Sequence, residues 1–584
     1  MSAIPDHHGG TIIADVLIRH GVKHLFTLCG GHISPILTGA EQRGIRVVDV
    51  RDEGNAVFAA DAVARMTGTV GVAAVTAGPG VTNTVTALKN AQMAQTPLLL
   101  LGGATATLLK GRGSLQDIDQ LSIMKPLTKW ATTIKAVPAI AQTIERAIAI
   151  ATSGVPGPVF VEVPVDLLYP EEMVRQMYAK EVGLGKGKGL AARALELYVK
   201  GHLYRQFKAP VLPELDLPEV KLPSLRTATD SIASAARAVR NAERPVLVVG
   251  SQAMVGVREP ARVAAALGEL GAPVYLAGSA RGLLGRHSDL QFRHARGNAL
   301  KEADVAVVCG FPFDFRLGYG RTIGRATVVT ANLSAAEMKK NRRPQVAVEM
   351  HPADFLVALA AQAGGNGARW APWFETLRGR ERARDAEIAK KAAPTGELVD
   401  PIHFFLRLEE HMADDAILVV DGGDFVATAS YIVRPRAPLA WLDPGVFGTL
   451  GVGGGFALGA ALARPGREVW LVWGDGSSAY TLAEFDSFVR HGVAPIALIG
   501  NDASWAQIAR EQVEMLGTPL GTELRRTDYH KVAEGYGGVG LELTDPAKID
   551  GTLAEARSIA RGGRPVCINV HLRATDFRKG SISM

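Results

Sequence analysis

The chain has 584 residues and a net charge of +6, and this length predicts three or four domains rather than one core. Its 47% hydrophobic and 21% charged residues are ordinary for a globular protein, and no run approaches the roughly 18 apolar residues of a membrane span. The basic residues form no long block and no nucleic-acid motif, so we expect no nucleic acid and no membrane as partners, and favour an anionic small molecule.

The N-terminal part of the chain alternates apolar strands with amphipathic helices, which predicts a parallel sheet. The expected strands are 24–28, 46–50, 72–76, 98–101 and 159–163. The first ten residues are polar and contain no signal-peptide core. Cys29, Cys309 and Cys567 lie in or near apolar strands without metal-binding spacing, so we expect buried free thiols and a cytoplasmic protein.

Residues 181–225 differ in character from the segments on either side. Residues 183–189 form a basic, glycine-rich loop, but no Ser or Thr follows a Gly-Lys pair as a P-loop requires. A helical pattern then places Leu195, Val199 and Leu203 on one face, and several prolines mark an extended linker. We expect a connector that packs on a neighbouring domain; a contribution to a ligand entrance is the alternative.

Two further α/β units follow along the chain. The second, 226–365, has expected strands at 246–249, 305–309 and 327–331. A charged helical linker, 366–397, ends near Pro394. The third, 398–572, has expected strands at 417–420, 469–473 and 496–499, and a polar tail, 573–584, ends the chain. The predicted fold class is therefore α/β, with three doubly wound parallel-sheet domains.

Two acidic motifs follow neighbouring strands of the third unit. Asp475, between Gly474 and Gly476, comes after the strand 469–473, and Asp502 follows 496–499. Ligands bind at the carboxyl ends of strands in open α/β sheets. Two carboxylates there suit Mg2+, and flanking glycines let the backbone approach a diphosphate. A single Asp in this position could instead be only a helix cap.

These motifs and several other segments resemble the thiamine-diphosphate-dependent, acetolactate-synthase-like superfamily. The matching segments are 51–56, 76–83, 31–33, 115–117 and 448–451, together with both acidic motifs. The resemblance covers nearly the whole chain and implies a pyrimidine-binding domain (1–180), a middle domain and a diphosphate-binding domain. It implies that Asp475, Asp502 and the Ser504 carbonyl hold Mg2+. The family pattern has Asn at the position of Asp502, so this chain carries one more negative charge there.

The resemblance also assigns roles around the cofactor. Glu53 would hydrogen-bond N1' of the aminopyrimidine and favour its protonated form; alone, an acid here would be read as a first-turn helix residue. The Gly448 carbonyl would accept from the 4'-amino group, and Leu450 would support the bent cofactor. The other expected cofactor contacts are Pro79, Asn83, Asp424, Phe425, Gly474, Gly476, Ser477, Trp505 and Ala506.

Two residues are expected on the substrate side. Gln116 would contact substrate or intermediate as a catalytic residue. His32 is a second catalytic candidate, although a histidine at a helix start is equally often structural.

Departures near Asp502 and the basic insert make the chain look like the acetolactate-synthase-like branch of 2-hydroxyacyl-CoA lyases. Arginines of the middle unit could then bind the phosphates of coenzyme A, or be surface residues. The tail could close over the ligand, or be a disordered terminus. The expected coenzyme A contacts are Gly31, Leu115, Arg281, Asp314, Phe315, Arg316, Arg578 and Lys579.

The implied activity is cleavage of a 2-hydroxyacyl-CoA to formyl-CoA and an aldehyde or ketone, with the condensation as its reverse. One alternative is acetolactate synthase, and another is an inactive, cofactor-binding relative. Because the superfamily builds its site from two chains, the resemblance implies a homodimer or homotetramer with shared active sites.

Overall fold

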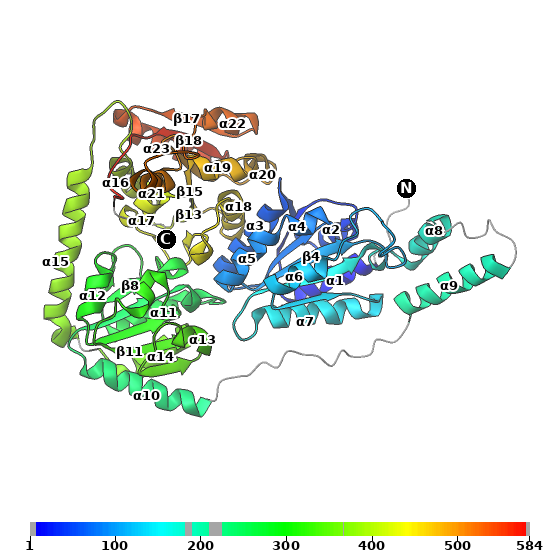
Figure 1. Ribbon diagram of the computed structural model, residues 1–584, viewed down its shortest axis with the longest axis horizontal. Coiled ribbons are helices and arrows are strands. Elements are labelled where there is room, and N and C mark those ends of the chain that lie inside the picture. Colours follow the sequence, from blue (N-terminus) through cyan, green and yellow to red (C-terminus); the bar gives the residue numbers. More distant parts are fainter. Residues whose placement is uncertain (1–6, 182–189, 209–224, 366, 580–584) are drawn as a thin grey trace. The chain divides into compact units, whose positions relative to one another are not determined.

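The computed structural model describes residues 7–181, 190–208, 225–365 and 367–579, which contain three six-stranded, fully parallel sheets (Figure 1). The chain divides into two compact units: Met1–Ala64 with Thr69–Val220, and Arg65–Gly68 with Lys221–Met584. The first unit holds one sheet and the second holds two. Among the described residues, no helix combines the length and the apolar character needed to cross a bilayer.

The sheet of the first unit has the strand order β2-β1-β3-β4-β6-β5. Its strands are β1 (His24–Leu28), β2 (Arg46–Asp49), β3 (Gly71–Val75), β4 (Leu98–Ala104), β5 (Trp130–Thr133) and β6 (Pro158–Pro164). β3, β4 and β6 are buried at every position, as strands of a parallel sheet covered on both faces are. The helices around this sheet are α1 (Gly9–Arg19), α2 (Ser34–Gln42), α3 (Glu53–Thr67), α4 (Pro79–Thr82), α5 (Val85–Ala94), α6 (Gln120–Met124) and α7 (Ile140–Thr152).

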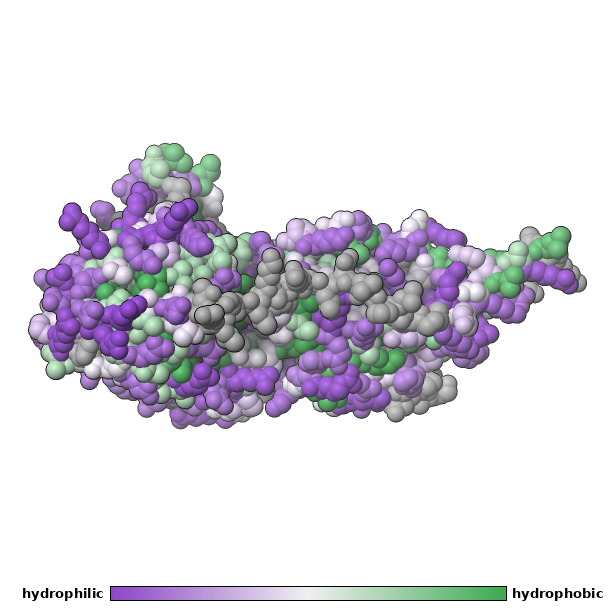
Figure 2. All heavy atoms as spheres, turned by 90° about the horizontal axis from the view of Figure 1, so that it is seen from below, coloured by the Kyte–Doolittle hydropathy of each residue, from purple (hydrophilic) through white to green (hydrophobic). Residues whose placement is uncertain are grey.

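Two helices, α8 (Glu171–Glu181) and α9 (Leu190–Phe207), follow this sheet. Val199 and Leu203 of α9 are buried, as predicted, and pack with Val174 and Tyr178 of α8. The prediction for Leu195 was wrong: its side chain is 39% exposed, because it lies outside this contact. Leu190 and Leu197, in the N-terminal half of α9, are also exposed. Figure 2 shows apolar side chains on the surface at the N-terminal end of α9. The loop 183–189 and the predicted proline-rich linker lie outside the described residues.

The middle sheet has the order β12-β11-β10-β7-β8-β9. Its strands are β7 (Pro245–Val249), β8 (Val274–Leu276), β9 (Gln291–Phe292), β10 (Val305–Cys309), β11 (Thr327–Asn332) and β12 (Val346–Glu349). Its helices are α10 (Leu225–Asn241), α11 (Pro260–Leu270), α12 (Arg296–Glu302), α13 (Ala335–Lys339) and α14 (Pro352–Ala363). The long helix α15 (Gly367–Lys391) leads to the third sheet (Figure 1).

The third sheet has the order β14-β13-β15-β16-β18-β17. Its strands are β13 (Ile417–Asp421), β14 (Trp441–Leu442), β15 (Val469–Gly474), β16 (Ile496–Asn501), β17 (Val539–Leu543) and β18 (Val566–His571). Its helices are α16 (Pro401–His411), α17 (Asp424–Ile432), α18 (Gly453–Ala463), α19 (Asp475–Thr481), α20 (Glu484–Arg490), α21 (Ala506–Leu516), α22 (Tyr529–Gly535) and α23 (Ile549–Arg561). Every strand predicted from the sequence is present, so the predicted fold class is confirmed.

The strand order locates the point where the chain reverses direction across the third sheet. From β13 the chain moves to β14 on one side and then to β15 on the other, so this reversal lies between β13 and β15. The first sheet reverses in the same way between β1 and β3. Crevices at the carboxyl ends of such strands are the usual ligand positions of open α/β sheets.

Candidate active site

In the first unit, the reversal point carries His32 and Thr76. The segment after β1 holds His32, and Thr76 follows β3; His32 Nδ1 lies 3.3 Å from Thr76 Oγ1. Burial lowers the pKa of His32, and a hydrogen bond with Gln116 opposes that shift. The neutral imidazole is therefore the favoured form near pH 7.

Glu53 begins α3 and is buried, with only 7% of its surface exposed. Asn83 Nδ2 donates to Glu53 Oε2 over 3.0 Å, so these two expected cofactor contacts lie together. A Cβ on Gly80 would lie 3.5 Å from Glu53 Oε1 and 2.8 Å from Thr76 Cγ2. The absence of a side chain at Gly80 therefore lets Thr76 pack closely near the carboxylate.

Gln116 lies in a loop, outside any helix or strand, and its backbone has a left-handed φ of +63°. Gly78 packs against it so closely that a Cβ on Gly78 would lie 2.9 Å from the Cβ of Gln116. Gly78 N also donates to Gln120 Oε1 over 2.8 Å, which ties Gly78 to the start of α6. Leu115 is 81% exposed, and Gly31 and Pro79 are also exposed.

In the third sheet, Asp475 and Asp502 follow the adjacent strands β15 and β16. Asp475 Oδ1 accepts from Gly476 N over 2.8 Å, whereas its buried Oδ2 has no hydrogen-bond partner. Asp502 Oδ1 accepts from Ser504 N over 3.2 Å. Ala503, between Asp502 and Ser504, has a left-handed φ of +58°, and this turn keeps Asp502 and Ser504 close together.

Both carboxyls have raised pKa values. Burial raises the pKa of Asp475 to about 6. Burial first, and then the charge of Asp475, raise the pKa of Asp502 to about 7. Two carboxylates that disfavour each other's charge, one with an unsatisfied oxygen, form the kind of site that a divalent cation stabilises.

Glycines near Asp475 let aromatic side chains pack closely around it. A Cβ on Gly476 would lie 2.5 Å from the Trp505 ring, so only glycine permits this contact. Ser477 is buried, and its Oγ donates to Asp421 O over 2.8 Å. Phe425 packs on Gly500, where a Cβ would lie 2.4 Å from the Phe425 ring.

Asp424 forms an ion pair with Arg510 that joins α17 to α21. Arg510 Nη2 lies 2.9 Å from Asp424 Oδ1, and Nη1 contacts Oδ2. Both side chains are largely buried. Arg510 therefore balances a carboxylate that lines the same cavity as Asp475.

The sequence reasoning missed Asp421, which anchors the loop of Gly448 and Leu450. The Asp421 carboxylate is fully buried and accepts from Gly451 N at 3.1 Å, Gly453 N at 2.8 Å and Trp473 Nε1 at 3.1 Å. Burial raises its pKa to about 6 despite these donors. Its position at the end of an apolar strand, before Gly422-Gly423, was the available signal.

A cavity of about 610 Å³ brings the expected residues of the third sheet together. Arg281 of the middle domain and Arg578 of the C-terminal segment also line it. Its lining includes Asp424, Phe425, Gly448, Leu450, Gly474, Asp475, Gly476, Ser477, Asp502, Ser504, Trp505 and Ala506. The cavity size, the open space at Gly448 and the unsatisfied Asp475 oxygen all fit a metal-bound diphosphate cofactor.

The expected coenzyme A contacts of the middle domain separate into two kinds. Arg281 reaches the cavity and stacks on Trp441 at 4.6 Å. Arg316 instead pairs with Asp314, with Nε at 3.0 Å from Oδ1, and stacks on Phe311 at 4.3 Å. Phe315 is 53% exposed.

Arg296, which sequence reasoning did not single out, belongs to this arginine group. It donates to Arg316 O over 2.9 Å. Burial lowers the pKa of Arg296, and the charges of Arg281 and Arg316 lower it further. The region therefore concentrates positive charge that an anionic ligand would relieve.

The C-terminal residues up to Lys579 pack against other parts of the second unit, to which they belong. Arg573 binds the buried Asp400, with Nη2 at 2.7 Å from Oδ2. Phe577 is buried against Tyr431, and Arg578 stacks on the same tyrosine at 5.1 Å. Lys579 lines a neighbouring cavity of about 840 Å³. Residues 580–584 lie outside the described part of the chain.

The cysteine prediction was correct for the thiol state and partly wrong for burial. All three cysteines are free, and Cys309 and Cys567 are buried in β10 and β18. Cys29 is exposed, because it lies just past the end of β1 rather than within it.

Three protein-family models match the chain. They describe the N-terminal TPP binding domain (residues 7–123), the central domain (232–359) and the C-terminal TPP binding domain (421–570) of thiamine pyrophosphate enzymes. A solved structure, the Rhodococcus jostii RHA1 thiamine diphosphate-dependent 4-hydroxybenzoylformate decarboxylase, has the same fold, with a TM-score of 0.75 at 21% identity over 98% of this chain and 100% of that one. The chain belongs to the thiamine pyrophosphate enzymes and is a thiamine-pyrophosphate-dependent lyase.

Its relatives include proteins of two names. It is 48% identical to the 2-hydroxyacyl-CoA lyase 2 of Danio rerio, over 99% of this chain and 93% of the relative. It is 34% identical to the acetolactate synthase large subunit IlvG of Mycobacterium tuberculosis, over 96% of this chain and 95% of the relative.

Proposed function

We propose that the protein cleaves 2-hydroxyacyl-CoA to formyl-CoA and an aldehyde or ketone, using thiamine diphosphate and Mg2+. The Asp475–Asp502 pair at the reversal point of the third sheet carries this proposal, since one of its buried oxygens lacks a partner. The acyl-CoA substrate is supported by the 48% identity to proteins named 2-hydroxyacyl-CoA lyase 2, against 34% to an acetolactate synthase.

The chain's own residues would hold and polarise the reacting groups. Asp475, Asp502 and the Ser504 carbonyl would bind Mg2+, and Ser477 and Gly476 would lie beside the diphosphate. Glu53, held by Asn83 at 3.0 Å, would stabilise the protonated aminopyrimidine. Thiamine diphosphate, when bound, supplies the electron sink that allows a carbon–carbon bond next to a carbonyl to break.

Substrate binding would rely on the arginine group of the middle domain. Arg281 lines the cavity. The charges of Arg281 and Arg316 both act on Arg296, so the three guanidinium groups lie near one another. Guanidinium groups suit the phosphates of coenzyme A because they donate two hydrogen bonds in a fixed plane. Gln116 and His32 would lie on the substrate side, as the resemblance implies.

We further propose a cytoplasmic homo-oligomer whose active site is shared between chains. Free, buried thiols at Cys309 and Cys567 suit a reducing compartment. The shared site rests on the resemblance to the superfamily.

An assay with several 2-hydroxyacyl-CoAs, each with thiamine diphosphate and Mg2+, tests the activity. We expect formyl-CoA release that is absent with the free 2-hydroxy acids, and little turnover of pyruvate. Glu53→Ala should abolish turnover, whereas Glu41→Ala, an exposed acid of the same unit, should not. Acetolactate synthases of the superfamily hold FAD in the middle domain, so pyruvate condensation together with stoichiometric FAD would support the synthase instead. Full turnover by Glu53→Ala would contradict the role assigned to Glu53.

A further inference from the structure

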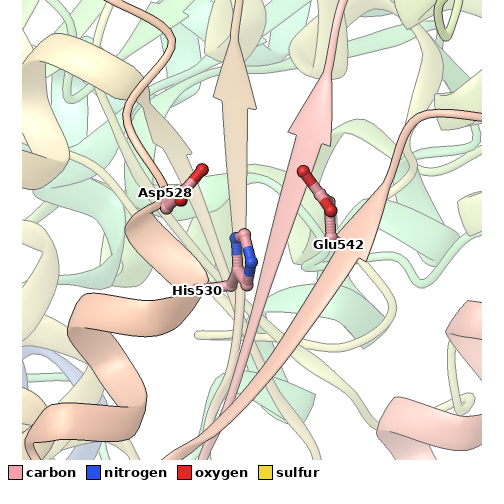
Figure 3. A group of neighbouring side chains, drawn as sticks. All are labelled: Asp528, His530 and Glu542. Carbon is pink, nitrogen blue, oxygen red and sulfur yellow. The ribbon is translucent and has the colours of Figure 1, made fainter.

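A second group of potential metal ligands lies on the third sheet, and none of its members lines the cofactor cavity. Asp528 precedes α22, His530 lies in its first turn, and Glu542 lies on β17. One ligand atom from each of these residues lies within 4.8 Å of the other two. Figure 3 shows the Asp528 and Glu542 carboxylates on either side of the His530 ring.

His571, at the end of β18, adds a fourth potential ligand. Its Nε2 lies 3.1 Å from Glu542 Oε1. His530 and His571 are only 7% and 8% exposed, whereas the carboxylates of Asp528 and Glu542 are about half exposed. The two imidazoles are therefore buried, whereas the two carboxylates are half exposed, with Glu542 already in contact with His571.

The surrounding groups support the two imidazoles. Asn569 Nδ2 lies 3.3 Å from His530 Nδ1 and 3.4 Å from His571 Nε2. Asn569 Oδ1 in turn accepts from Asn501 Nδ2 over 3.1 Å. Asn569 Nδ2 also donates to Thr527 O over 3.0 Å, so this amide is held in place beside both rings.

Lys531 is a cation paired with Asp528, and the charge of Arg526 also acts on His571. Lys531 Nζ lies 2.6 Å from Asp528 Oδ2, which leaves the second oxygen of Asp528 for another partner. Both side chains are well exposed, so this ion pair is weak and does not compete strongly with a bound cation.

We propose that Asp528, His530, Glu542 and His571 form a binding site for a divalent transition-metal ion such as Zn2+. Two nitrogen and two carboxylate ligands suit Zn2+ or a similar ion, whereas Mg2+ prefers oxygen ligands alone. Ligands at about 2.1 Å from a tetrahedral ion lie roughly 3.4 Å apart. Binding would therefore require the half-exposed carboxylates of Asp528 and Glu542 to move closer to the imidazoles than the 4.8 Å that now bounds the group.

The bound ion would be structural, since all four ligands come from the protein. It would join the start of α22 to the ends of β17 and β18. Through Asn569 and Asn501 it would also support the residue directly before Asp502. This role is independent of which acyl group the enzyme uses.

Isothermal titration of the chelator-treated protein with Zn2+, in saturating thiamine diphosphate and Mg2+, tests the site. We expect one tight Zn2+ per chain and a higher Tm of the loaded protein. Glu542→Gln and Asp528→Asn, both at half-exposed positions, should each weaken Zn2+ binding at least tenfold, and His530→Ala should abolish it. Circular dichroism checks that each variant folds.

Two controls separate this site from the cofactor's metal site and from surface histidines. Asp475→Asn should lose Mg2+-dependent cofactor binding but keep the tight Zn2+ site. His287→Ala, at an exposed position, should bind Zn2+ like the unaltered protein. Unchanged Zn2+ affinity in folded Glu542→Gln and Asp528→Asn variants, or loss of the site in Asp475→Asn, would overturn the proposal.

Discussion

Asp475 and Asp502 are adjacent acids whose burial opposes their ionisation, and this makes cation binding depend on pH. Their pKa values are raised to about 6 and about 7, so near pH 6 both are partly protonated in the metal-free protein. A cation binds the ionised forms and displaces these protons. Affinity should therefore rise with pH and level off once both groups are ionised.

We predict that the apparent affinity for Mg2+, with thiamine diphosphate present, rises roughly tenfold or more between pH 6 and pH 8. Titration calorimetry in buffers of different ionisation enthalpy would measure both the affinity and the protons released. Asp502→Asn, which restores the amide of the family pattern, should flatten the dependence. An equally steep profile in that variant would assign the protons to other groups.

At Gly476, a single added methyl group is expected to weaken cofactor binding. A Cβ there would lie 2.5 Å from the Trp505 ring, so Gly476→Ala must displace the ring that lines the cavity. We expect thiamine diphosphate affinity to fall at least tenfold, measured by fluorescence titration. Gly551→Ala, where a Cβ meets nothing within 4 Å, is the matched control and should bind normally. Equal affinities in the two variants would contradict the packing argument.

At the scale of elements, α21 has no buried residue, and the Asp424–Arg510 ion pair joins it to α17. Removing Arg510 leaves the Asp424 carboxylate uncompensated in the cavity expected to bind a diphosphate. A buried charge without its partner is strongly unfavourable, whereas neutralising both partners is less so.

We therefore predict that Arg510→Met weakens thiamine diphosphate binding about tenfold or more, and that adding Asp424→Asn restores much of it. Equilibrium dialysis of the single and double variants measures this coupling. Arg490→Met, which breaks the Arg490–Asp486 pair on α20, is the matched control and should have no effect. If the double variant binds no better than Arg510→Met, the charge argument fails.

Apart from the half-buried edge strand β2, which was predicted, the predictable strands differ physically from the others. Central strands such as β4 and β15 are continuous apolar runs, because both of their faces are covered. The edge strands β5, β12 and β17 are only half-buried, and β14 has two residues, so their sequences lack that signal. β18 is fully buried, yet Asn569 and His571 interrupt its apolar pattern.

The candidate site was predictable where residues follow strands and less so elsewhere. The third-sheet residues expected at the cofactor lie around one cavity. Asp421 was missed because its partners are backbone N–H groups of a loop 30 residues away, and only folding brings them together. Arg296 was missed because no motif surrounds it in the sequence, and only folding of the middle domain brings it close to Arg281 and Arg316.

At the scale of the whole molecule, Glu53 and Asp475 belong to different compact units. If each active site uses Glu53 of one chain and Asp475 of another, two inactive variants can complement each other. Glu53→Gln and Asp475→Asn should each be inactive alone.

Mixed dimers of these variants should contain one intact site of two, so random assembly should recover about a quarter of the normal turnover. Co-expression with two affinity tags, followed by the lyase assay, measures this recovery. The control is a dimer of two Glu53→Gln chains that carry the two different tags, which should have no activity. Isolated mixed dimers without activity would mean that both residues act within one chain.

The first and third sheets have the same strand order once their strands are numbered from each sheet's own start, 2-1-3-4-6-5. The two sheets carry different side chains at the same topological position: the acids Asp475 and Asp502 in the third sheet, and His32 and Thr76 in the first. One strand order thus places two chemically different ligand-facing edges in a single chain.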